Sequence, residues 1–145
     1  MKKSKRLDTV RTVSAQKEKA AAEQVGQARK QLSQAEQQLS TLFSYRNDYR
    51  QNLVNLGAEG ISPMLFRDYH TFLERLDSAI NQQNQRLDKV DSQLKNALSE
   101  WASANGKLKA MDSLIERVKQ EEEKIEDKRE QRILDDRPRR NLDWN

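Results

Sequence analysis

The chain has 145 residues, no cysteine, four glycines, two prolines and a formal net charge of +4. The lack of cysteine excludes a disulfide framework and a thiolate metal site, and so small a positive surplus does not by itself indicate nucleic-acid binding. A composition rich in glutamine, lysine, glutamate, alanine and leucine is typical of long helices and coiled coils.

No stretch approaches the roughly 20 apolar residues that a membrane-spanning helix needs. The beginning, MKKSKRLDTV, is basic but no apolar run follows it, so we expect no secretory signal. We expect a single domain over residues 1–145. Two long helices have no deep interior, and an enclosed active site is therefore not expected.

The first predicted element is a helix from about residue 5 to 56. Apolar residues recur in it at alternating steps of three and four, the period of a helix that buries one narrow seam against another helix. The stripe is less regular near the basic start. The seam positions are Val25, Ala28, Leu32, Ala35, Leu39, Leu42, Arg46, Tyr49, Leu53 and Leu56.

A loop over residues 57–62 is expected next. Gly57 stands where the end of a helix favours a left-handed residue. Ser62 followed by Pro63 is a typical pair for the start of a new helix. A connection of about six residues between two long helices forces them to run antiparallel, which predicts a helical hairpin.

The second helix is predicted from about residue 63 to 134. We expect it to pass the N-terminus of the chain near residue 115 and to continue as an overhanging C-terminal helix. A disordered tail over residues 135–145 should follow, since Pro138 and mixed charges oppose a helix there. The seam positions are Phe66, Tyr69, Leu73, Leu76, Ile80, Gln83, Leu87, Val90, Leu94, Ala97, Trp101, Ala104, Leu108, Met111, Ile115 and Val118.

The two stripes fit one another if the turn centres near residue 59 or 60. Apolar residues then face apolar residues at nearly every layer, with Arg46 and Gln83 as the exceptions. The predicted fold is all-α, a long two-stranded antiparallel coiled coil. Its layers pair Val25 with Leu94, Leu32 with Leu87, Leu39 with Ile80, Leu42 with Leu76, and Leu53 with Phe66.

Aromatic residues flank the seam near the loop. Tyr45 and Phe72 occupy equivalent flanking positions, which neighbour one another in an antiparallel pair, so we expect them at one level. Exposed apolar patches with a polar rim usually mark a partner site. The alternative is that the rings only widen the seam. The expected face also includes Leu42, Tyr49, Tyr69 and Leu76.

Chemistry-bearing motifs are missing from the sequence. His70 is the only histidine, and it has no nucleophile and carboxylate set near it in the sequence. The run EEEKIED lacks the spacing of a metal-binding loop, and Gly57 and Gly60 are not followed by the residues of a phosphate-binding loop. We therefore expect no enzyme, no cofactor and no metal site.

The segments QAEQQLSTLFSYRNDYRQNL and FRDYHTFLERLDSAINQQ, with the short glycine-containing loop between them, resemble the FliJ family. Length, unequal arms and the YxNxYR core agree with that family, a soluble component of the bacterial flagellar type III export apparatus. The resemblance implies an antiparallel coiled coil similar to the central stalk of rotary ATP synthases. It also implies a cytoplasmic protein at the cytoplasmic face of the inner membrane.

The resemblance further implies three kinds of partner. The joined termini would engage the hexameric export ATPase FliI, a patch near the loop would bind the cytoplasmic domain of the export gate protein FlhA, and export chaperones would also bind. The family pattern can have a histidine at position 83, and an amide can hydrogen-bond as an imidazole does. Carried onto matching positions, the patch comprises Gln38, Leu42, Tyr45, Tyr49, Phe72, Leu76, Ala79 and Gln83.

Two other functions are open on the sequence alone. The same apolar face could serve a general coiled-coil chaperone or escort for export substrates or their chaperones, and client binding without the gate protein would distinguish it. A nucleic-acid binder would use MKKSKR and RPRR. These basic runs lack interleaved aromatic residues, so we expect no nucleic-acid partner.

Overall fold

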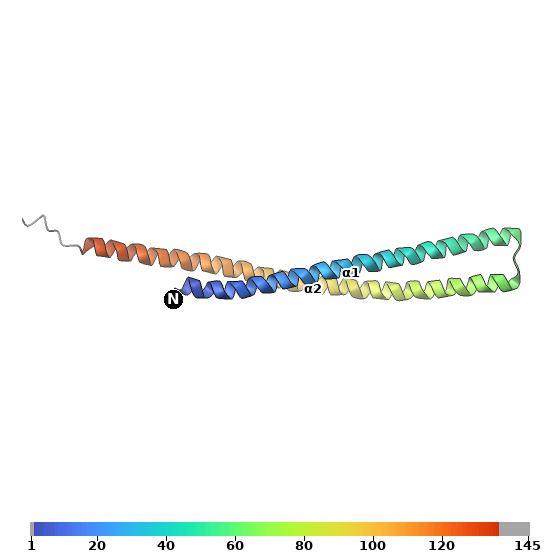
Figure 1. The fold of residues 1–145 in the computed structure, drawn as a ribbon, viewed down its shortest axis with the longest axis horizontal. Helices are drawn as coiled ribbons and strands as arrows, with labels where there is room; N and C mark the ends of the chain where they lie inside the picture. Colours follow the sequence, from blue (N-terminus) through green and yellow to red (C-terminus); the bar gives the residue numbers. More distant parts are fainter. Residues whose placement is uncertain (1, 137–145) are drawn as a thin grey trace, which may run out of the picture. The chain divides into compact units, whose positions relative to one another are not determined.

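The computed structural model describes residues 2–136, which form two α-helices joined by a short loop. Helix α1 spans Lys3–Glu59 and helix α2 spans Pro63–Asp135. The two helices run antiparallel on either side of the loop (Figure 1). The predicted all-α antiparallel hairpin is confirmed. Within the described residues, neither helix carries an apolar stretch long enough to cross a membrane.

The loop is shorter than the sequence pattern predicts. Helix α1 continues through Gly57 to Glu59, and Gly60 is the residue that adopts the left-handed conformation, with a φ of 89°. The prediction that Gly57 ends the first helix is therefore wrong. A helix needs only one left-handed residue at its end. Gly60 supplies that residue, so Gly57, Ala58 and Glu59 remain helical. The connection contains only Gly60, Ile61 and Ser62.

The start of α2 follows the predicted capping chemistry. The Oγ atom of Ser62 accepts a hydrogen bond from the backbone N–H of Leu65 at 3.1 Å. Pro63 takes the first helical position, where its missing N–H is not needed. The serine satisfies one of the four backbone donors that every helix start leaves free.

The chain divides into two compact units, each held together by contacts among its own residues, and we describe them separately. The loop unit is Ala20–Trp101, and the terminal unit combines Met1–Lys19 with Ala102–Asn145. Of the terminal unit, the structure describes residues 2–19 and 102–136. The single domain expected from the sequence stays a prediction.

The core of the loop unit is a thin seam between the helices. Ala35 is the most deeply buried of its residues, with 1% of its surface exposed. A small side chain there allows the backbone of α1 to come close to α2, and the Nε2 atom of Gln83 donates a hydrogen bond to the Ala35 carbonyl at 3.1 Å. This contact lies between the layers predicted for Leu32 with Leu87 and Leu39 with Ile80. The other buried core residues are Ala28, Leu76, Ile80 and Val90.

In the terminal unit, α1 begins beside Glu122. The backbone N–H and the hydroxyl of Ser4 both donate to the Glu122 carboxylate, at 3.1 and 2.7 Å. The prediction that α2 passes the N-terminus near residue 115 is therefore wrong by about two turns. The loop centres on Ile61 rather than on residue 59 or 60, and this moves the partners of α1 residues toward higher numbers along α2. The buried apolar residues of this unit are Ile115 and Val118.

Helix α2 continues unbroken to Asp135, and no separate C-terminal helix follows it in the part of the chain described. All side chains of residues 123–136 are exposed, and they include Ile125 with 67% of its surface accessible. The predicted disordered tail began at residue 135. Asp135 is helical, Asp136 donates its N–H to the Arg132 carbonyl at 2.9 Å, and residues 137–145 lie outside the described residues.

Candidate partner-binding patch near the loop

The candidate patch is the set of eight residues singled out in the sequence, four from each helix of the loop unit. In both helices the four follow the same spacing of four, three and four, which places them on one stripe of each helix. Because α1 and α2 are antiparallel neighbours, the two stripes can form one surface. The patch consists of Gln38, Leu42, Tyr45, Tyr49, Phe72, Leu76, Ala79 and Gln83.

An aromatic cluster forms the centre of the patch. The rings of Tyr49 and Phe72 have their centroids 4.2 Å apart at 33°, and the rings of Tyr49 and Tyr69 lie 5.8 Å apart at 55°. Such pairs contribute roughly 0.5–1.5 kcal/mol beyond the area they bury. The expected neighbour of Phe72 was Tyr45, but the ring that Phe72 contacts is Tyr49. The loop centres later in the chain than the sequence pattern predicts, so each α1 residue faces an α2 residue about one turn further along. Tyr49 therefore contacts Phe72.

The members of the patch differ in exposure. Leu76 is buried, with 7% of its surface exposed, and it forms the floor of the patch together with half-buried Tyr49. Tyr45 and Phe72 are 54% and 37% exposed. The patch therefore has a packed floor and two accessible rings. Of the remaining members, Gln38 is exposed, and Leu42, Ala79 and Gln83 are half-buried.

A pair of amides forms the end of the patch furthest from the loop. The Nε2 atom of Gln83 donates to the Ala35 carbonyl and also to Oε1 of Gln38, both at 3.1 Å. Both N–H groups of the Gln83 amide are thus engaged. The Gln38 amide nitrogen and the Gln83 oxygen remain as the groups that this pair offers to a partner. They border a shallow depression lined by Gln34, Gln37, Gln38, Thr41, Leu42 and Gln83.

Arg46 is the charged exception in the seam. Its guanidinium carbon lies 4.8 Å from the centre of the Phe43 ring, and its Nη1 atom lies 3.4 Å from Oδ1 of Asp77. The buried Nε atom of Arg46 has no hydrogen-bond partner among the described residues. A half-satisfied guanidinium in a seam weakens packing, and the pair with Asp77 is its contact with the other helix.

Comparison with known proteins decides the family. A family model described as "Flagellar FliJ protein" matches residues 2–142. The chain belongs to the FliJ family. It is 29% identical to the flagellar FliJ protein of Escherichia coli (strain K12) over 111 residues, which are 77% of this chain and 76% of that protein. It is 28% identical to the flagellar FliJ protein of Salmonella typhi over 111 residues, with the same coverage of 77% and 76%.

The comparison confirms the resemblance derived from the sequence. FliJ proteins are non-enzymatic components of flagellar protein export, and this chain is one of them. Within the described residues, no group of three or more histidine or carboxylate side chains could hold a metal ion.

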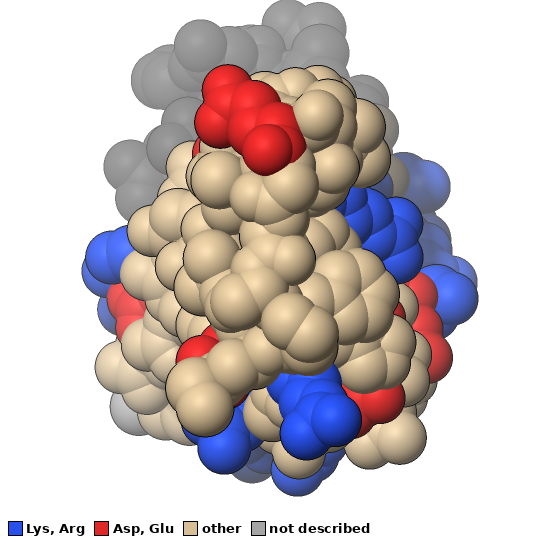
Figure 2. Space-filling model, turned by 90° about the vertical axis from the view of Figure 1, so that its right-hand side faces the viewer, with Lys and Arg blue, Asp and Glu red and all other residues tan. Residues whose placement is uncertain are grey.

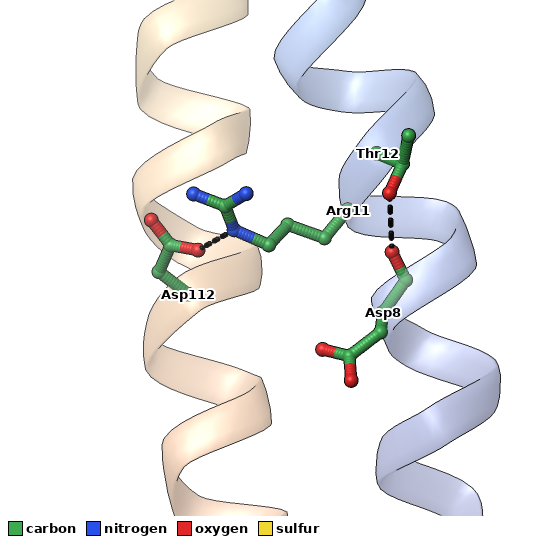
Figure 3. Close-up of polar contacts among 4 residues, drawn as sticks. All are labelled: Asp8, Arg11, Thr12 and Asp112. Atoms are coloured by element: carbon green, nitrogen blue, oxygen red, sulfur yellow. Dashed lines mark hydrogen bonds and ion pairs between the residues drawn. The ribbon is translucent and has the colours of Figure 1, made fainter.

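Sequence reasoning named no partner-contact residues in the terminal unit of this FliJ chain, where the structure shows a mixed-charge surface. Arg11 reaches from α1 to Asp112 of α2, while Thr12 donates back to the Asp8 carbonyl at 3.0 Å (Figure 3). The hydrogen bond that Arg11 donates to Asp112, together with the negative charge of Asp112, raises the pKa of Arg11. A nearby depression is lined by Lys2, Ser4, Lys5, Asp8, Lys119, Glu122, Glu123, Glu126 and Asp127.

The Ser4 clamp on Glu122 is the other feature that sequence reasoning missed. The Glu122 carboxylate accepts the backbone N–H and the hydroxyl of Ser4 in the first turn of α1, and it acts as a cap supplied by the other helix. The hydroxyl and the backbone N–H of Ser4 lower the pKa of the Glu122 carboxyl. Ser4 in the first turn of α1 is a weak sequence signal for a helix cap. The residues around Ser4 give no indication that the partner is a carboxylate 118 positions further along the chain.

Proposed function

We propose that this FliJ chain is a helical coupling component between the export ATPase and the export gate. In this proposal the terminal unit engages the FliI hexamer, and the candidate patch binds the cytoplasmic domain of FlhA. The chain performs no chemistry itself; it promotes assembly of the ATPase ring and links ATP turnover to gate activation. It works in the cytoplasm at the inner membrane and also receives export chaperones.

The observation that carries the gate-binding part is the presence of two accessible rings in a patch whose Leu76 is buried. Tyr45 and Phe72 are 54% and 37% exposed, although phenylalanine and tyrosine rings normally gain by burial. The Phe72 ring packs against half-buried Tyr49 with the ring centroids 4.2 Å apart, so this ring is already ordered before a partner binds. Rigid aromatic anchors with neighbouring amide donors and acceptors are typical of interface hot spots.

The ATPase part is supported by the charge pattern of the terminal unit. Basic residues near the start of α1 lie beside acidic residues of α2, and both signs line one depression. Paired opposite charges on an exposed surface contribute little to folding. They remain available for the electrostatic recognition of a charged ring interior, which sets specificity and association rate.

The test of the gate-binding site replaces Phe72 or Tyr45 by alanine in the full chain. Binding to the FlhA cytoplasmic domain, measured by titration calorimetry, should weaken about tenfold or more, as expected for truncation of an anchor ring. Val13→Ala is the matched control, because Val13 is an exposed apolar residue of the terminal unit, 47% accessible. Circular dichroism should show unchanged helix content. Wild-type affinity in both ring variants would refute the assignment of the patch.

The test of the ATPase site removes the charged ends of the chain. Stimulation of FliI ATPase activity should fall, whereas affinity for the FlhA domain should stay the same. Full stimulation by the shortened chain would contradict the proposed role of the terminal unit.

A further inference from the structure

The loop end of the loop unit carries a hollow that the candidate patch does not include. It is mainly apolar and opens to solvent. Figure 2 looks onto this end of the molecule, where uncharged residues make up most of the foremost surface and charged groups lie mainly toward its edge. The hollow is lined by Leu53, Gly57, Gly60, Ile61, Pro63, Phe66 and Arg67.

An accessible aromatic side chain lines this hollow. Phe66 is 50% accessible, and Met64 and Val54, which are neighbours in the chain of the lining residues Pro63 and Leu53, are 74% and 65% accessible. Phe66 lies one turn before Tyr69, whose ring contacts Tyr49 of the aromatic cluster. The hollow is therefore linked to the candidate patch through Tyr69, which lies beside the patch and contacts its member Tyr49.

Two glycines keep the hollow open. A Cβ atom added at Gly57 or Gly60 would meet no atom within 4 Å, so both positions border open space. Gly60 needs its glycine for a φ of 89°. Gly57 does not, because it is helical and nothing packs against it. Glycine inside a helix costs stability relative to alanine, and folding does not explain its presence at position 57.

Arg67 is the one charged residue among the described residues that line the hollow. Arg67 is exposed and, in the part of the chain described, forms no ion pair. A guanidinium beside an apolar hollow suits a carboxylate that lies next to an inserted apolar side chain.

We propose that this hollow receives one apolar side chain from an acidic segment of the same gate protein that binds the candidate patch, with Arg67 pairing to a neighbouring carboxylate. This inference rests on the proposed function, since it extends the gate-binding surface over the loop end. Gly57 then serves binding by leaving the space that the inserted side chain needs.

The experiment uses the full chain and the FlhA cytoplasmic domain as the probe. Gly57→Ala should leave the thermal midpoint unchanged or raise it, and it should weaken binding by roughly fivefold or more, because an added methyl group occupies space needed at the interface. Gly26→Ala is the matched control: Gly26 is also helical, also borders open space, and lies far along α1 from the loop. It should gain the same helix stability without loss of affinity.

Arg67→Gln supplies an independent readout. It should weaken binding and reduce the dependence of affinity on salt, since it removes one charge pair. If Gly57→Ala and Arg67→Gln bind as the wild type does while Phe72→Ala does not, the hollow is refuted and the proposed function stands. If Phe72→Ala and Tyr45→Ala also bind normally, the gate-binding proposal fails and the hollow falls with it.

Discussion

Arg46→Leu should stabilise the hairpin, although it removes an ion pair. The Arg46 side chain is only 24% exposed, and its Nε atom is buried without a partner. Such an unsatisfied group costs roughly 1–3 kcal/mol. A leucine in its place would bury apolar surface for roughly 1.5–3 kcal/mol. Both effects favour the leucine variant.

The losses in Arg46→Leu are smaller than the gains. Asp77 is 48% exposed and lies 3.4 Å from the guanidinium, so this pair contributes at most about 1 kcal/mol. The contact with Phe43 adds about 0.5–1 kcal/mol. We therefore expect a net gain of about 2 kcal/mol in the free energy of unfolding, and a rise of several degrees in the thermal midpoint.

The assay is thermal and urea unfolding followed by circular dichroism at 222 nm. Asp77→Asn is the comparison, because it removes the charge of the partner but leaves Arg46 in the seam, and its midpoint should fall slightly. A decrease of about 1 kcal/mol or more in Arg46→Leu would refute the reasoning. It would show that Arg46 stabilises the seam more than its visible contacts indicate.

Two further predictions concern the seam and the terminal unit. Ala35→Leu should lower the free energy of unfolding by about 1–3 kcal/mol, because the residue is only 1% exposed and a larger side chain would push the helices apart; an unchanged urea midpoint would contradict this close approach. Ser4→Ala should lower the thermal midpoint at neutral pH. The pKa of Glu122 is lowered in the folded chain, so this clamp stabilises above the ordinary carboxyl pKa and is lost as the pH falls through the folded value. The difference between Ser4→Ala and the wild type should therefore shrink as the pH falls below the ordinary glutamate pKa of about 4.3, and a difference that does not shrink with acidification would contradict the clamp.

The helices and their direction follow from local patterns. An apolar stripe with steps of three and four identifies a helix that packs along one seam, and Ser62 with Pro63 marks the start of α2. The end of α1 was harder to predict, because Gly57 and Gly60 stand close together and either could adopt a left-handed conformation. The choice depends on how far packing of the seam extends the helix.

The candidate patch could be predicted only in part. Equal spacing in both helices placed Tyr45, Tyr49 and Phe72 on facing stripes. It did not indicate that Phe72 packs on Tyr49 and that Tyr45 stays exposed. That depends on the axial stagger of the helices, and a shift of one turn exchanges ring partners without changing either stripe.

The sequence by itself determined that this chain forms two long helices, that they fold back on one another and that it resembles FliJ, because periodicity, turn residues and the YxNxYR core are properties of the chain order. Only the tertiary structure decided the stagger between the helices, the cap that Glu122 supplies to α1 and the open hollow beside Gly57. These features depend on contacts between residues far apart in the chain. Such contacts form only once the two helices have paired in one register.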